Sequence, residues 1–240
     1  MVRDLLRTEI LDGRWVGGAL PTEDDISARF RAGRNVVREA LALLVEERLV
    51  QRVQGSGTRP TAHVMVHSLN SLRGIAEDGN SNVDGAPVQY RLLAWDTVAA
   101  PATIAEQLGV AEGEPVVFWE RLTVGPEPLV LWSSWVRADL GLERPAEVTG
   151  SLGGGTFAFF EQHGLEVEVA HARTGAAQAD PAVAELLGTV SGSPTMVQHR
   201  QTRLASGQVI EVAVGYYRSD LIFLSNDFRR PPRPGTPLAE

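Results

Sequence analysis

The residues Arg34–Leu41 read RNVVREAL, and the residues Gln54–Thr58 read QGSGT. The first stretch has apolar side chains at helical spacing, and its two arginines stand four positions apart on a separate face. The second stretch places glycines at the tip of a hairpin between two short strands. An arginine-fronted helix followed by a glycine-tipped hairpin is typical of a winged helix-turn-helix, a DNA-binding module.

The residue types in these two stretches suit contact with a duplex. A helix fits the major groove with its first turn towards the base edges, where Arg can bond guanine and Asn can read adenine. The wing offers backbone N–H groups, with Arg52 and Arg59 for phosphate or minor-groove contact. The alternative is an ordinary solvated helix face that happens to carry two arginines.

Two further helices are predicted before the arginine-fronted one. Val2–Leu11 is amphipathic, with one apolar stripe formed by Val2, Leu5, Leu6 and Ile10. Thr22 and Asp25 form a capping box, from which a second helix runs to about Phe30 with Ile26 and Phe30 buried. The third helix runs through Glu47, with Val37, Ala40, Leu41 and Leu44 on its apolar side. The order of three helices and a hairpin weakens the solvated-face alternative.

The distribution of charge supports the same division. The chain of 240 residues carries a net charge of −8, but residues 1–63 hold ten Arg against nine acids and residues 64–240 hold twelve against twenty-one. An N-terminal part that can approach phosphate is therefore followed by an acidic part that cannot. Cysteine is absent, which excludes disulfides and a cysteine nucleophile. With no basic-then-apolar leader and no long apolar run, we expect a cytoplasmic protein.

The remainder of the chain predicts a second domain of the α+β class. Short β-rich segments alternate with helices at Pro101–Leu108, Thr156–His163 and Pro181–Leu187, which indicates a mostly antiparallel sheet. We expect a winged helix-turn-helix at residues 1–62, a linker at 63–73, a second domain at 74–228 and a tail at 229–240. The glycine-rich region 74–85 is the expected coupling segment between the domains.

The second domain contains a weak internal repeat. Each copy reads helix, glycine turn, strand, hairpin, strand, so two units could pack about a pseudo-two-fold axis with a cleft at their junction. A shift of 79 residues superposes Ala105/Ala184, Glu106/Glu185, Leu108/Leu187, Gly109/Gly188, Gly113/Gly192, Pro115/Pro194, Arg121/Arg200 and Thr123/Thr202.

The N-terminal motifs resemble the DNA-binding domain of the GntR superfamily of bacterial transcription regulators. The resemblance spans residues 2–60 and includes the LPTE sequence at Leu20–Glu23. It implies DNA contacts by the residues Arg34, Asn35, Arg38, Arg52, Gly55, Ser56, Gly57 and Thr58. Two positions depart from the family pattern: Asp24 stands where Arg is frequent, within an acidic run that should repel phosphate, and Gly33 replaces a hydroxyl residue before the recognition helix.

Residues 71–228 resemble the UTRA effector-binding domain of the HutC subfamily, which is similar in fold to chorismate lyase. The segments that carry the resemblance are Ile104–Gly109, Gly113–Arg121, Glu161–Leu165 and Gly207–Asp220. In sugar-phosphate-sensing members, the positions of Arg121, Glu211 and Tyr217 line the effector pocket. Here the other pocket positions hold smaller or more apolar residues, namely Thr123, Trp132, Gly155 and Phe157. We therefore expect an effector that is less charged and more hydrophobic than a sugar phosphate.

These observations favour a homodimeric transcription regulator, most simply a repressor, that binds a palindromic operator and responds to a small molecule. We expect no catalytic residues, cofactor, metal or membrane contact, because the histidines lack metal-ligand spacing and no nucleophile elbow or P-loop occurs. One alternative is a chorismate-lyase-like enzyme with an accessory DNA-binding module. Another is an architectural DNA-binding protein whose second domain only dimerises.

Overall fold

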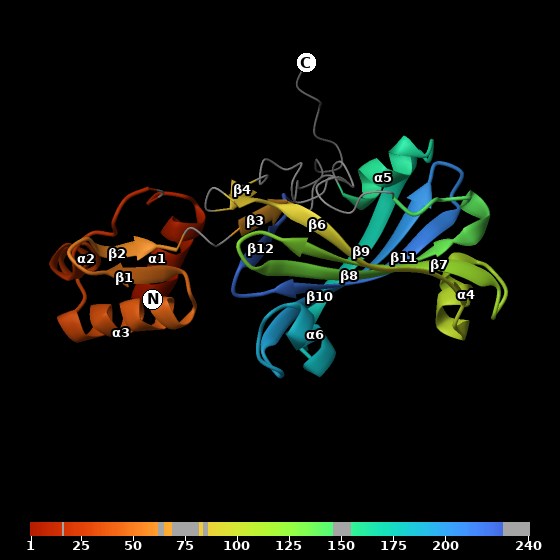
Figure 1. Ribbon diagram of the computed structural model, residues 1–240. Helices are drawn as coiled ribbons and strands as arrows, with labels where there is room; N and C mark the ends of the chain where they lie inside the picture. Colours follow the sequence, from red (N-terminus) through yellow and green to blue (C-terminus); the bar gives the residue numbers. More distant parts are fainter. Residues whose placement is uncertain (16, 62–64, 69–81, 84–85, 146–154, 228–240) are drawn as a thin grey trace, which may run out of the picture.

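The computed structural model describes residues 1–15, 17–61, 65–68, 82–83, 86–145 and 155–227. A small helical module at the N-terminal end is joined to a larger domain built on one sheet (Figure 1). The predicted fold class is confirmed, because an N-terminal winged helix-turn-helix precedes a large antiparallel sheet with helices on its faces. The tail expected at 229–240 lies outside the described residues, and so does most of the region 74–85.

The N-terminal module consists of three helices and a two-stranded hairpin. The helices are α1 (Val2–Leu11), α2 (Glu23–Phe30) and α3 (Arg34–Glu46), and the wing pairs β1 (Val50–Val53) with β2 (Gly57–Pro60). One apolar cluster joins all three helices to the first wing strand, and the four predicted α3 positions are buried in it. Leu5 differs from the prediction because its side chain is 43% exposed, which leaves Val2, Leu6 and Ile10 as the buried stripe of α1.

The ends of α2 and α3 follow from their first residues. Thr22 Oγ1 accepts a hydrogen bond from the backbone N–H of Asp25, while Asp25 accepts one from the backbone N–H of Thr22, so the predicted capping box is present. Helix α3 begins after Gly33, which has no side chain to cap it. Phe30 is half-buried against the common core, and Ile26 is fully buried as expected.

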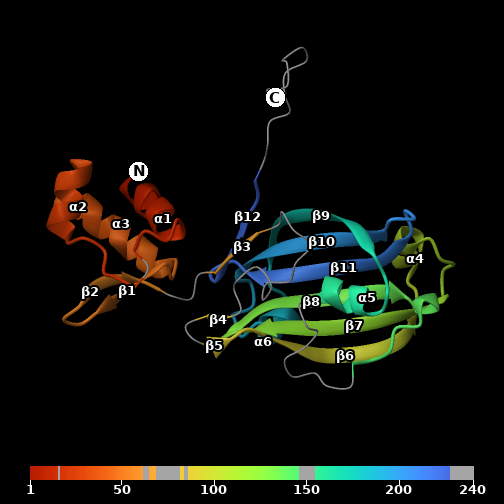
Figure 2. The ribbon, with the colours of Figure 1, turned by 90° about the horizontal axis from the view of Figure 1, so that it is seen from above.

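A six-stranded antiparallel sheet forms the second domain, with strand order β6-β7-β8-β11-β10-β9 (Figure 2). Its strands are long; β7-β8 and β10-β11 are hairpins, and helices connect the other successive strands. Their bounds are β6 (Gln89–Ala99), β7 (Pro115–Val124), β8 (Pro128–Arg137), β9 (Val167–Gln178), β10 (Pro194–Leu204) and β11 (Val209–Arg218). The short strands β4 (Asn82–Val83) and β5 (Ala86–Pro87) pair beside it, and a 3-10 turn, η1 (Ala138–Leu140), follows β8.

The sheet order shows how the two sequence repeats are arranged. Helix α4 (Ala102–Leu108) leads to the hairpin β7-β8, and α6 (Pro181–Leu186) leads to the hairpin β10-β11. The two hairpins meet at the central pair β8-β11. From either edge inward, the strand order is therefore the first strand of a unit, then the two strands of its hairpin. Helices α4 and α6 cover one face of the sheet, and α5 (Thr156–Gln162) lies on the opposite face (Figure 1).

The two domains meet at a short parallel ladder. Strand β12 (Ile222–Ser225) follows the sheet and pairs with β3 (Met65–Ser68), which comes directly from the N-terminal side. Strand β3 lies within the linker expected at 63–73, whose remaining positions are outside the described residues. Phe223 of β12 packs against the apolar core of the N-terminal module. The C-terminal end of the described chain therefore contacts both domains.

Candidate functional site

The residues that the sequence assigns to DNA lie on one exposed part of the N-terminal module. Arg34, Asn35 and Arg38 lie within the first five positions of α3, and all three are exposed. The predicted wing residues Gly55, Ser56 and Gly57 are also exposed, with both glycines at positive φ, whereas Thr58 is half-buried. A groove of about 780 Å³ lies between the wing and the start of α2, lined by Leu20–Glu23 and Arg52–Thr58. Helix and wing together present donors to one ligand surface.

The acidic run at the start of α2 faces these arginines. Glu23 Oε2 accepts a hydrogen bond of 2.8 Å from Arg38 Nε, and Asp24 Oδ1 lies 3.0 Å from Arg34 Nε. The hydrogen bond that Arg38 donates to Glu23, together with the charge of Glu23, raises the pKa of Arg38 above its ordinary value. Exposed ion pairs of this kind contribute little to stability. Their importance is therefore electrostatic and local, because they change the charge that the recognition helix presents.

The predicted effector residues come together on the α5 face of the sheet. In the strand register, Arg121 pairs with Trp132, Thr123 pairs with Val130, and Val130 pairs with Tyr217. Cross-strand partners point to the same side of a sheet, and so do residues two apart on one strand. The same alternation places Glu211 on this face, because it is six residues before Tyr217 on β11. Helix α5 contributes Phe157, whose ring contacts Arg200. Gly155 is the N-cap of α5 and has a φ of 95°, which suits glycine.

Arg121 is buried, and two of its three guanidinium nitrogens have no acceptor among the residues that the structure describes. The residue is 5% exposed, and its Nε and Nη1 atoms have no hydrogen-bond partner. The guanidinium carbon lies 4.9 Å from the centre of the Tyr90 ring, which supplies an aromatic face but no charge. Burial lowers the pKa of Arg121, since a desolvated cation is disfavoured. An unsatisfied buried donor of this kind is the group in this domain best suited to bind an anion.

Arg200 is a site residue that reasoning from the sequence missed. It is the repeat partner of Arg121, so the superposition of the two copies could have revealed it. Its Nε and Nη2 donate to the two oxygens of Glu211 at 3.1 and 2.9 Å. Glu211 is fully buried and also accepts from Ser134 Oγ at 2.9 Å and Thr202 Oγ1 at 2.6 Å. Four hydrogen bonds fill the acceptor sites of this carboxylate, two from Arg200 and one each from Ser134 and Thr202.

Aromatic side chains form the walls around these two arginines. Arg200 is sandwiched between the rings of Trp132 and Phe157, at 4.1 and 4.9 Å from guanidinium carbon to ring centre. The Trp132 ring reaches that position by lying flat over Gly215, where an added Cβ would come within 2.7 Å of the ring. Burial raises the pKa of Tyr217, so its hydroxyl stays protonated and donates to Gln198 Oε1 at 3.3 Å. The site therefore combines aromatic walls and neutral hydrogen-bonding groups with the closed ion pair of Arg200 and Glu211 and the guanidinium of Arg121.

A third feature connects this domain to the recognition helix. Arg218, the residue after Tyr217, is almost fully buried and donates to both oxygens of Asp220 at 2.7 Å and to the carbonyl of Leu187. Arg48, just beyond the end of α3, places Nη1 3.3 Å from Asp220 Oδ2. Burial raises the pKa of Asp220, but the hydrogen bonds of Arg218 and the charge of Arg48 outweigh it, and the net shift is downward.

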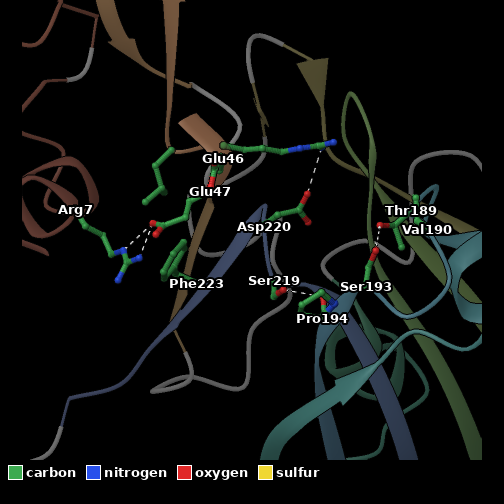
Figure 3. A pocket seen from close by; sticks show the side chains of 12 residues that line it. Arg7, Glu46, Glu47, Thr189, Val190, Ser193, Pro194, Ser219, Asp220 and Phe223 are labelled. Carbon is green, nitrogen blue, oxygen red and sulfur yellow. Dashed lines mark hydrogen bonds and ion pairs between the residues drawn. The ribbon is translucent and has the colours of Figure 1, made fainter. Parts of the chain in front are cut away.

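A cleft of about 590 Å³ accompanies this contact between the domains (Figure 3). Arg7, Glu46 and Glu47 line it from the N-terminal module, while Ser219, Asp220 and Phe223 line it from the sheet domain. Glu47 is held by Arg7, whose Nη2 lies 2.5 Å from Glu47 Oε2. The charged side chains of the cleft are thus largely paired with one another.

Two further classes of site were sought in the part of the chain that the structure describes. No group of three or more His, Asp or Glu side chains there has an arrangement that could hold a metal ion. None of the helices in those residues is long and apolar enough to cross a membrane.

Comparison with known proteins gives consistent results for both domains. Residues 1–59 match the family described as bacterial regulatory proteins, gntR family, and residues 84–222 match the UTRA domain. The HTH-type transcriptional regulator Rv0792c of Mycobacterium tuberculosis (strain ATCC 25618 / H37Rv) is 30% identical over 220 residues, covering 90% of this chain and 80% of that protein. The HTH-type transcriptional repressor NagR of Bacillus subtilis (strain 168) is 26% identical, covering 91% and 89%.

Solved structures show the same likeness. The crystal structure of PhnF from Mycobacterium smegmatis is 26% identical and superposes with a TM-score of 0.63, covering 96% of this chain and all of that one. A structure of YydK from Bacillus subtilis subsp. subtilis str. 168, at 20% identity and a TM-score of 0.57, shares the fold. Rv0792c and NagR are transcription regulators rather than enzymes, so the chorismate-lyase-like alternative is not supported.

Proposed function

The chain belongs to the gntR family of bacterial regulatory proteins and carries a UTRA domain, and from this premise we propose that it is a homodimeric repressor. Two copies would bind a palindromic operator, each placing α3 in the major groove. A small molecule bound on the α5 face of the sheet would change the DNA affinity. Such a ligand acts only by binding the DNA-competent and DNA-incompetent arrangements unequally.

The observation that carries the DNA-binding part is the exposure of three reading residues at the start of one helix. Arg34, Asn35 and Arg38 project from its first turns, next to a wing whose tip is also exposed. Two large hydrophobics of α3 are exposed among the described residues, Val36 at 51% and Val45 at 38%, but they stand on opposite sides of the helix and form no continuous apolar patch that would suggest burial against the sheet domain. Guanidinium and amide groups in this position are suited to base edges.

The observation that carries the effector part is the unpartnered guanidinium of Arg121. Arg200 is neutralised by Glu211, and Tyr217 is neutral, so one uncompensated positive charge remains among the site residues. A phosphate monoester carries about 1.5 to 2 negative charges at neutral pH and would exceed it. A carboxylate matches it and can accept two N–H groups from one guanidinium. We therefore assign the effector to small monocarboxylates with a ring or branched apolar body.

The contact at Arg48 offers a route from effector to DNA. Tyr217 faces the effector site and Arg218 follows it on the opposite face, where it holds Asp220. Asp220 in turn lies against Arg48 at the end of the recognition helix. A shift of β11 on ligand binding would be passed to the N-terminal module through these two residues. This route requires two discrete arrangements of the interface, as coupling does in general.

The decisive experiment is a selection of bound sequences from a random duplex pool, followed by affinity measurements on the selected operator. Arg38→Ala is expected to lower operator affinity at least about 30-fold, since a bidentate guanine contact contributes about 1–3 kcal/mol and its phosphate alternatives are lost too. The variant should remain dimeric in analytical ultracentrifugation, because Arg38 is exposed. In the same assay, apolar monocarboxylates should release the operator and sugar phosphates should not.

The matched control is Arg14→Ala, which removes the same charge from the exposed segment after α1. Arg14 bonds Glu9 and contacts neither α3 nor the wing. Operator binding by Arg38→Ala at the strength of the unaltered protein would overturn the assignment of α3 as the reading helix. Release by sugar phosphates alone would overturn the effector class and leave the DNA assignment standing.

A further inference from the structure

The reading arginines and the acids of α2 form two matched pairs. Glu23 bonds Arg38 at 2.8 Å and Asp24 lies 3.0 Å from Arg34. The third acid of the run, Asp25, is used differently, because its carboxylate accepts hydrogen bonds from the backbone N–H and the hydroxyl of Thr22. The capping box thus fixes the first turn of α2 and leaves the two preceding acids directed at α3.

The atoms involved make these pairs informative. In both pairs the nearest guanidinium atom is Nε, at the inner edge of the arginine fork. The terminal Nη1 and Nη2 groups are the ones left for a ligand beyond the helix. All four side chains are substantially exposed, with values of 71% for Arg34, 68% for Asp24, 65% for Arg38 and 34% for Glu23. Water and DNA can therefore reach the arginines without any rearrangement of the fold.

We propose that Glu23 and Asp24 are specificity-determining residues, which position Arg38 and Arg34 for guanine and suppress binding to phosphate. This inference rests on the proposed assignment of α3 as the reading helix. A carboxylate held at Nε restricts rotation of the guanidinium and directs its two terminal groups outward, where they match the two acceptors O6 and N7 of guanine. A phosphate in the same place would bring its negative charge close to the carboxylates.

The charge of the reading face follows from this arrangement. Arg34 and Arg38 are each matched by an acid, whereas Arg31 in the turn before α3 and the wing residues Arg52 and Arg59 have no ion-pair partner among the described residues. Non-specific affinity depends on the number of phosphates that basic groups neutralise, and it falls with salt in proportion to that number. The protein should therefore bind arbitrary DNA weakly and with a shallow salt dependence. Discrimination then comes from base contacts, which the acids leave intact.

The test compares the full-length protein with Glu23→Gln, Asp24→Asn and the double variant. Fluorescence anisotropy with a duplex of mixed sequence is expected to show about a tenfold tighter Kd for the double variant at low salt. The plot of log Kd against log salt concentration should steepen by about 1 to 2, since two cations become available to phosphate. Selection from a random pool should give weaker guanine enrichment with Glu23→Gln, because Arg38 loses its orientation.

The control is Asp12→Asn, which makes the same change of charge at the exposed end of α1. It has no ion-pair partner among the described residues and should leave the Kd and the selected sequence unchanged. Circular dichroism checks that α2 remains folded in each variant. An unaltered affinity and salt slope in the double variant would overturn the proposal, and so would unchanged guanine enrichment in Glu23→Gln. Arg38→Ala separates the outcomes: if it too has no effect, the reading helix itself is wrongly assigned.

Discussion

The two repeat units of the sheet domain differ in what surrounds their equivalent arginines. Arg200 on β10 and Arg121 on β7 occupy matching positions, each two residues before a threonine. Thr202 pairs in register with Glu211, whereas Thr123 pairs with Val130. The second unit thus has a carboxylate where the first has an isopropyl group. One cross-strand residue makes Arg200 a satisfied structural group and leaves Arg121 available to a ligand.

The difference shows how a binding site can arise inside a symmetrical scaffold. The two arginines are almost equally buried, since Arg200 is 7% exposed and Arg121 is 5% exposed, so burial alone does not distinguish them. What differs is the number of acceptors, which is two carboxylate oxygens for Arg200 and none for the Nε and Nη1 of Arg121. Because a buried cation without a counterion is unfavourable, the first unit is stabilised when an anion arrives.

The largest effect is expected from breaking the satisfied pair. Arg200→Met should lower the free energy of unfolding by about 3–5 kcal/mol, because it leaves Glu211 charged and buried without its cation. Denaturation by urea, monitored by tryptophan fluorescence, measures the change. The double variant Arg200→Met/Glu211→Leu should recover most of the loss, since no buried charge then remains. If Arg200→Met were as stable as the unaltered protein, Arg200 and Glu211 would not form an ion pair in solution.

The same substitution in the first unit should have the opposite sign. Arg121→Met removes an unpaired buried cation, which outweighs the lost contact with Tyr90, so we expect the free energy of unfolding to rise by about 1 kcal/mol. It should also abolish the thermal stabilisation that apolar monocarboxylates give the unaltered protein. A clear loss of stability in this variant would mean that Arg121 already has a counterion within the chain.

The smallest effect is expected when the first unit is converted into a copy of the second. Val130→Glu places a carboxylate opposite Thr123 and should change the free energy of unfolding by no more than about 1 kcal/mol, since a buried ion pair roughly balances its desolvation. Release of DNA by the effector should disappear, because the new carboxylate would bond the guanidinium of Arg121 in place of the effector.

The control for this conversion is Leu131→Glu, on the next residue. Leu131 is equally buried but belongs to the apolar cluster under α6, on the other face. The buried cation on this face, Arg218, is already bonded to Asp220, so the new carboxylate has no free partner there and this variant should lose more than about 3 kcal/mol. Equal destabilisation by the two glutamates would contradict the equivalence of the two units.

Local features of the N-terminal module were predictable because neighbouring residues decide them. The capping box of Thr22 and Asp25, the apolar face of α3 and the glycines of the wing all depend on residues within one or two turns. Leu5 was predicted wrongly because helical spacing gives the width of an apolar stripe but not which edge the partner helices cover. The role of Asp24 was foreseen only in part, since its charge was evident and its pairing with Arg34 was not.

The sequence by itself determined the fold class, the helices of the N-terminal module, the repeat and the apolar face of α3. These follow from periodicity and from short-range hydrogen bonding, which act along the chain. Only the tertiary structure decided which arginine is neutralised. Arg200 and Glu211 meet through a bulged hairpin, and Arg48 meets Asp220 across the domain boundary. The energy of a buried charge depends on atoms within a few ångströms in space, and those atoms come from strands and domains that sequence spacing does not align.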